Sequence, residues 1–202
     1  MKPFDHWFAI AGLALLCGCS ATSPPTHYHS LVPALAPSGA GARALPTPSL
    51  QVQVLPVVVP AQVDVPQIVI RNADDSLSVL EYERWIAPLG DEIRGAVALR
   101  IEQMLAQGVP ATAPASDHTW RVRIDVQRFD SMLGRAASMQ LQWSLRATGG
   151  GASLRCHATY EQPVGPGVTA LAAGHRALVE QLGDVIGQAI KTAAAGGTPA
   201  CG

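Results

Sequence analysis

Three neighbouring segments alternate between apolar and polar residues, and this alternation restricts the fold more than any other feature. They begin near Trp120, Met139 and Leu154. Successive side chains of a β-strand point to opposite faces, so the segments predict three strands with one face covered and one face in water. Gly149-Gly150-Gly151 supplies a turn between the last two. The apolar positions are Trp120, Val122, Ile124 and Val126; Met139, Leu141, Trp143 and Leu145; and Leu154, Cys156, Ala158 and Tyr160.

Shorter segments nearer the N-terminus predict additional strands. Residues 50–54 alternate apolar residues with Gln, which indicates a half-buried strand. Residues 67–71 and 77–82 flank the turn-forming residues 72–75 and predict a hairpin. A brief alternation over Tyr28–Val32 predicts an edge strand.

Two segments have the period of an α-helix instead. One runs from Leu89 to Leu105 with an apolar residue at every fourth position, and Gly108 and Pro110 are expected to end it. The other spans residues 168–194. Two long helices with about five to six strands predict an α/β two-layer sandwich with a mixed, mostly antiparallel sheet.

The N-terminus has the pattern of a lipoprotein signal peptide over residues 1–18. Residues 8–16 are uninterrupted apolar residues, too few to span a bilayer but typical of a signal-peptide core. Leu16-Cys17-Gly18-Cys19 resembles a lipobox, in which an aliphatic residue and two small residues precede the cysteine that is lipidated. Cys19 is therefore the predicted lipidation site. An ordinary signal peptide cut nearby and a core helix are the alternatives.

Lipidation of Cys19 would anchor the chain in a membrane through several fatty acyl chains. Ser20 follows the cysteine where an Asp tends to retain lipoproteins in the inner membrane, so we expect the periplasmic face of the outer membrane. Residues 19–48 then form a lipidated tether with the early strand and a flexible loop. Residues 49–195 form a periplasmic domain, and residues 196–202 a flexible tail.

The cysteines leave one alternative open. The periplasm is oxidising, so Cys156 and Cys201 are able to pair. Cys156 lies on the apolar side of its predicted strand, however, and Cys201 lies in a Gly/Ala-rich tail. These positions favour a buried, free Cys156 over a disulfide.

Charge and motifs exclude several function classes. The net charge is −1 and no Lys/Arg run is present, so a nucleic-acid partner is not expected. The sequence has no G-x-S-x-G, H-E-x-x-H or C-x-x-C motif, and we predict no catalytic residue, cofactor or metal. His27 and His29 have the spacing of a metal-binding pair but lack a third ligand nearby in sequence. His175, within an apolar helical stripe, is predicted to be packed with a hydrogen-bond partner.

The segment Glu81–Leu89 concentrates charged and aromatic residues before the first helix. Arg84, Trp85 and Pro88 are candidates for a partner interface, because such residues often anchor protein contacts. The alternative is a structural corner, in which Trp85 is buried and Arg84 pairs with Glu81 or Glu83.

At this segment the chain resembles the ABC-type transport auxiliary lipoprotein component family of the PqiC/YmbA type. The resemblance extends over most of the chain after the lipobox, and Val65 departs from it by standing where an Arg is common. The matching segments are Tyr28-His29-Ser30-Leu31, Val57 to Arg71, Glu83-Arg84-Trp85-Ile86-Ala87-Pro88-Leu89, Val126-Gln127-Arg128-Phe129-Asp130 and Gln142-Trp143-Ser144-Leu145.

The resemblance implies a non-enzymatic periplasmic component without a cofactor. Its implied partners are an MCE-domain periplasmic protein and an ABC transporter permease/ATPase complex that move lipids between the inner and outer membranes. We expect binding through exposed strand edges or the polar sheet face, with a symmetric homo-oligomer as one arrangement. The alternative function is a structural lipoprotein of envelope or secretion-complex assembly.

Overall fold

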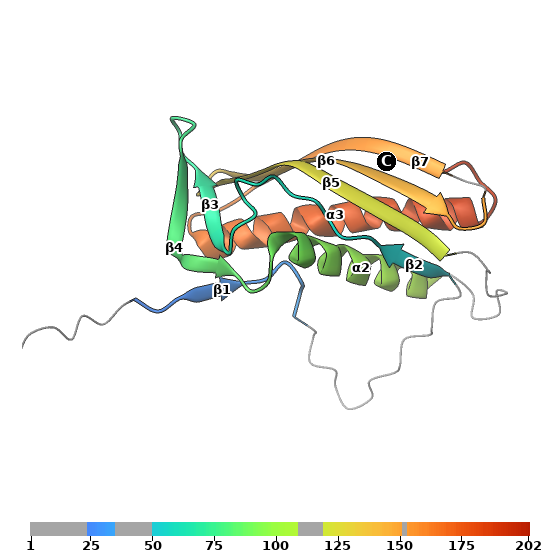
Figure 1. The fold of residues 1–202 in the computed structure, drawn as a ribbon, viewed down its shortest axis with the longest axis horizontal. Helices are drawn as coiled ribbons and strands as arrows, with labels where there is room; N and C mark the ends of the chain where they lie inside the picture. Colours follow the sequence, from blue (N-terminus) through green and yellow to red (C-terminus); the bar gives the residue numbers. More distant parts are fainter. Residues whose placement is uncertain (1–23, 35–49, 109–118, 151–152) are drawn as a thin grey trace, which may run out of the picture.

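The computed structural model describes residues 24–34, 50–108, 119–150 and 153–202, so the predicted signal peptide and Cys19 lie outside it. Within these ranges two long helices and seven strands follow one another in the order shown in Figure 1. The elements are β1 (His27–His29), β2 (Gln51–Val54), β3 (Gln67–Arg71), β4 (Leu77–Trp85), α2 (Leu89–Gly108), β5 (Thr119–Met132), β6 (Ala136–Ala147), β7 (Ser153–Pro163) and α3 (Val168–Ala194).

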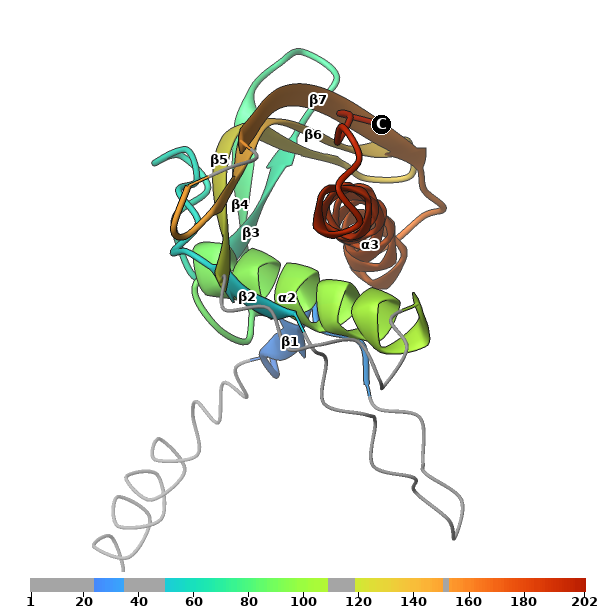
Figure 2. The same cartoon turned by 90° about the vertical axis from the view of Figure 1, so that its right-hand side faces the viewer.

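The larger sheet has four strands in the order β2-β5-β6-β7. Strand β2 runs parallel to β5, and the other pairs are antiparallel. Both helices lie on the concave side of this sheet, with α3 beneath β6 and β7 and α2 beside β2 (Figure 2). The predicted α/β sandwich with a mixed, mostly antiparallel sheet is confirmed.

The remaining strands form a separate three-stranded sheet, β1-β4-β3, at one end of the domain (Figure 1). After β2 the chain follows β5 as far as Val58, whose carbonyl accepts a hydrogen bond from the Val126 amide. A turn then begins at Pro60, which accepts a hydrogen bond from the Val63 amide. This turn directs the chain away from β5, so β3 starts a second sheet that local periodicity does not reveal.

The core lies between the larger sheet and the helices. On α2 the residues at every fourth position are buried as predicted, and Trp143 of β6 is 1% exposed. The helices approach closely at Gly183, where a Cβ atom would lie 2.7 Å from the Cβ of Arg100. Beside this contact, the Arg100 guanidinium donates hydrogen bonds of 2.6 and 3.0 Å to Asp184. No helix in the described ranges is long and apolar enough to cross a membrane.

Cys156 and Cys201 form a disulfide, so the prediction of a free Cys156 is wrong. Helix α3 ends in a reversal, in which Gly196 adopts a φ of 78° and the Gly197 amide donates to the Thr192 carbonyl. The reversal turns the chain back and brings Cys201 beside β7 (Figure 2). The segment predicted to be a flexible tail is thereby tied covalently to the sheet.

Candidate functional site

Residues 29–32, at the end of β1 and just after it, are built into the domain. Leu31 is fully buried, and its amide and the Ser30 hydroxyl each donate a 2.7 Å hydrogen bond to the Glu92 carboxylate. Glu92 lies in the first turn of α2, where the helix dipole favours a negative charge. Arg176 of α3 donates a 2.8 Å hydrogen bond to the Ser30 carbonyl. The chain therefore leaves the domain at a defined place.

Strand β1 joins β4 through a parallel ladder in which Tyr28 lies opposite Arg84. On the other face of this ladder, the carboxylate oxygens of Glu83 form hydrogen bonds with the two histidines of β1. Oε1 lies 3.0 Å from His27 Nδ1, and Oε2 lies 2.5 Å from His29 Nε2. Burial raises the pKa of Glu83, but the hydrogen bonds from the two histidines outweigh it and hold the pKa below its usual value. This His–Glu–His cluster fixes β1 to β4.

The cluster contains His27 and His29, which have the spacing of a metal-binding pair in the sequence. Glu83 adds a third side chain between His27 and His29 that sequence spacing could not reveal, because the residues are 56 and 54 positions apart. Across the described ranges, however, no group of three His, Cys, Asp or Glu side chains is arranged to hold a metal ion. The three side chains are a hydrogen-bonded contact between strands.

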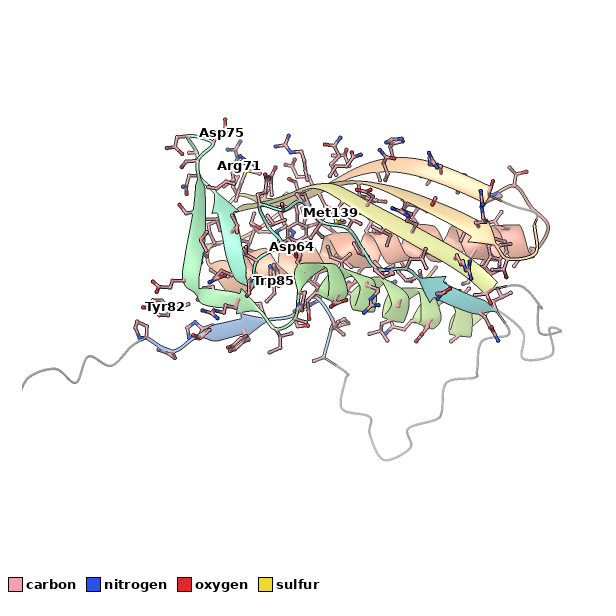
Figure 3. All side chains as sticks on the ribbon, in the orientation of Figure 1. Asp64, Arg71, Asp75, Tyr82, Trp85 and Met139 are labelled. Atoms are coloured by element: carbon pink, nitrogen blue, oxygen red, sulfur yellow. A yellow bond between two sulfur atoms is a disulfide. The ribbon has the colours of Figure 1, made fainter. Side chains whose placement is uncertain are left out.

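The three candidate interface residues fall in different environments. Trp85 is 5% exposed and points into the domain, where its ring meets Phe129 edge-on at 6.3 Å (Figure 3). Arg84 is half-buried, and Pro88 is exposed. The prediction of a structural corner is therefore correct in that Trp85 is buried. It is wrong in pairing Arg84 with Glu81 or Glu83, because Glu83 contacts the two histidines and Arg84 forms no ion pair in the described part of the chain.

A buried serine–histidine contact lies behind Trp85. Ser131 Oγ and His175 Nε2 are 2.8 Å apart, and the imidazole stacks on Phe129 with a centroid distance of 3.9 Å. Burial lowers the pKa of His175 to about 3, against an opposing effect of Asp130, so the ring is neutral near pH 7. A nucleophile and base could share this geometry, but the residues are 2% and 0% exposed, which keeps substrates away. The pair fits the predicted packed histidine.

Ionic contacts attach the β3–β4 hairpin to the larger sheet. Arg71 of β3 donates hydrogen bonds of 3.0 and 2.8 Å to Asp130 of β5, which is 6% exposed. Arg128 donates to the second carboxylate oxygen at 2.8 Å. Because the Asp130 charge is nearly buried, this pairing stabilises it and holds the hairpin, and with it β4, against the domain.

One protein family matches most of the chain. The model of the ABC-type transport auxiliary lipoprotein component family matches residues 33–187. The chain belongs to this family. The match covers the two helices up to residue 187 and strands β2 to β7, and it confirms the resemblance seen in the sequence. The family is one of auxiliary lipoprotein components of ABC-type transport.

Two solved structures share the fold. The DUF330 protein of Xanthomonas campestris is 22% identical and has a TM-score of 0.60, with 85% of this chain and 98% of that chain covered. A protein described as uncharacterized is 17% identical, with a TM-score of 0.61 and coverage of 83% and 99%. Comparison with curated proteins gives no match.

Proposed function

We propose that this protein is the lipid-anchored, non-enzymatic accessory component of an ABC/MCE-type system that transports lipids between the inner and outer membranes. The observation that carries the proposal is the family match over residues 33–187. Cys19 in the sequence Leu16-Cys17-Gly18-Cys19 supplies the anchor, and Ser20 favours the periplasmic face of the outer membrane.

The attachment of β1 supports a domain held close to its membrane. Only eight residue steps separate Cys19 from His27, the first residue of β1. Even fully extended, eight steps span at most about 29 Å. A lipidated Cys19 therefore keeps the β1 end of the domain within that distance of the bilayer, where an MCE-domain protein crossing the periplasm would meet it.

Crosslinking in intact cells tests the transport role. We expect an affinity-tagged protein to recover an MCE-domain protein, together with the permease and ATPase of an ABC transporter. The Cys19→Ala variant should lose this recovery because it lacks the anchor. Cys17→Ala is the matched control, since it changes a neighbouring cysteine but keeps a small residue before Gly18 in the lipobox.

One outcome would contradict the transport role, and another would contradict the role of the anchor in it. Recovery of β-barrel or peptidoglycan-bound proteins in place of an MCE-domain protein would favour the alternative of a structural lipoprotein in envelope or secretion-complex assembly. Equal recovery by the Cys19→Ala variant would show that the anchor is not needed for the contact.

A further inference from the structure

The outer face of the β1–β4 ladder carries a group of exposed side chains that the fold does not use. Tyr28 lies opposite Arg84 in the register, so the two side chains share this face. Tyr82 and Ile86 stand two positions on either side of Arg84: Tyr82 lies in the irregular stretch of β4 between its pairings at Leu80 and Arg84, and Ile86 follows the last residue of the strand. Tyr28 is 58%, Tyr82 37% and Ile86 59% exposed.

The two faces of this ladder differ in their contacts. Figure 3 shows Trp85 pointing into the domain, while Tyr82 points away from it at the β1 end of β4. On the inner face Trp85, His29 and Glu83 are buried or half-buried, and only His27, at the end of β1, is exposed to a degree comparable with Tyr28. Nothing in the described part of the chain covers the outer face to a similar degree.

The chemistry of the outer face is that of a surface at a membrane boundary. Tyrosine has an apolar ring and a polar hydroxyl and is enriched at the level of lipid headgroups. Ile86 adds an exposed aliphatic side chain beside them. Arg84 forms no ion pair within the described residues, and a guanidinium suits a lipid phosphate.

We propose that the outer face of the β1–β4 ladder, formed by Tyr28, Tyr82, Arg84 and Ile86, rests in the headgroup layer of the bilayer that holds the lipid anchor. This inference rests on the proposed lipidation of Cys19. Tyr28 is nine residues from Cys19, so the anchor confines this face to the neighbourhood of the bilayer. The face then adds a second, weaker contact that orients the domain.

The position of the chain's exit favours a lipid surface over a protein partner. The strand that carries Tyr28 is the one that leads directly to the anchor, and Glu92 and Arg176 fix its far end to both helices. The lipid anchor is therefore connected to a strand that is held firmly in the domain. The side chains nearest to that strand are the first to reach the membrane.

Fluorescence quenching by lipids tests this orientation. The full-length protein, purified in detergent from the cells that produce it, is reconstituted into phosphatidylethanolamine/phosphatidylglycerol vesicles that contain brominated phosphatidylcholine. Ile86→Trp reports on the outer face. Val79→Trp is the matched control, because Val79 is 58% exposed but lies where β4 pairs with β3. The native tryptophans give both variants the same background.

We expect the bromine atoms to quench Ile86→Trp about twofold or more strongly than Val79→Trp, because indole at the headgroup level contacts the acyl-chain boundary. Adding Arg84→Gln to Ile86→Trp should reduce this quenching by weakening the contact with anionic lipid. Equal quenching of the two reporters would overturn the inference. So would a blue-shifted Ile86→Trp emission without quenching, which would show that a second copy or another protein covers the face.

Flotation of the same vesicles separates this inference from the proposed function. If the reconstituted proteins float with the vesicles but the two reporters are quenched equally, the anchor is present and the orientation is wrong. If the proteins do not float, the proposed lipid anchor itself is wrong, and the orientation inferred from it falls with it.

Discussion

The four-stranded and the three-stranded sheets differ in what attaches them to the rest of the domain. The larger sheet is covered by α3, with Leu141, Trp143 and Leu182 at most 1% exposed, and a disulfide ties the C-terminus to its edge strand. The smaller sheet also buries Ile68, Ile70 and Trp85 in the core, but polar contacts add to its attachment. The polar contacts to the rest of the domain are Arg71–Asp130, Glu92 to Ser30 and Leu31, and Arg176 to Ser30, while His27–Glu83–His29 joins β1 to β4 within the sheet.

The larger sheet therefore acts as the stable scaffold of the domain, and the smaller sheet carries the proposed membrane-contacting face. Apolar burial is insensitive to pH, whereas paired and buried ionisable groups make stability depend on their protonation. The smaller sheet should therefore respond to single polar substitutions, while the larger sheet should respond to changes in volume and, through the buried His175 of α3, to acid. The smaller sheet also carries exposed apolar side chains, including Tyr28, Val79 and Ile86.

The largest expected effect is in the apolar region. Trp143→Ala should lower the free energy of unfolding by about 3–5 kcal/mol, because it leaves a cavity under α3. Trp143→Phe keeps most of the volume and should cost much less. Urea denaturation measures both. A loss below about 1 kcal/mol for the alanine variant would mean that the core is not where the stability lies.

The disulfide should contribute nearly as much. It closes a loop between residues 45 positions apart, so Cys201→Ala should cost about 2–4 kcal/mol. Cys201 is exposed, which avoids placing a new side chain in the core. Urea denaturation with and without a reductant supplies the control. The two proteins should become equally stable when reduced, and a difference that persists would indicate another cause.

The next effect is the pH dependence from His175. Its folded pKa of about 3 lies below the unfolded value near 6.5, so the unfolded chain binds a proton that the folded protein does not. Stability should therefore fall between pH 6.5 and 3, by about 1.4 kcal/mol per pH unit from this group. His175→Gln, compared with the wild type by urea denaturation at several pH values, should remove that part of the slope. An unchanged slope would rule out a buried neutral imidazole.

The smallest effect concerns the attachment of the N-terminal segment. Glu92→Gln should cost about 1–2 kcal/mol, because it replaces a charged acceptor of two hydrogen bonds by a neutral one. Hydrogen exchange at the Leu31 amide should accelerate more than exchange in β6. Ser30→Ala removes only one donor and is the milder control. Uniform acceleration across the domain would mean that the segment does not open independently.

Local patterns predicted most of the fold. The period-four apolar residues placed the start of α2 at Leu89, and alternation placed β5, β6 and β7 correctly. Strand β1 was predicted over Tyr28–Val32 but spans His27–His29, because Leu31 enters the core after the strand ends. The division into two sheets was missed, since it depends on a turn at Pro60 that redirects the chain.

Contacts between residues that lie far apart in the sequence were harder to predict from it. The pairing of Glu83 with His27 and His29, and of Cys156 with Cys201, joins segments that are tens of residues apart. Periodicity shows which face a residue occupies but not which strand or tail lies against that face. Of the outer face of the β1–β4 ladder only Arg84 was recognised from the sequence, because Tyr28 was not known to lie beside β4.

The most direct test of the account is metabolic labelling of cells with a fatty-acid probe, followed by mass analysis of the N-terminal peptide. The account predicts acyl chains on Cys19 as the first residue of the mature protein, with no label in the Cys19→Ala variant. An unlabelled wild-type protein that washes freely out of the envelope would contradict it.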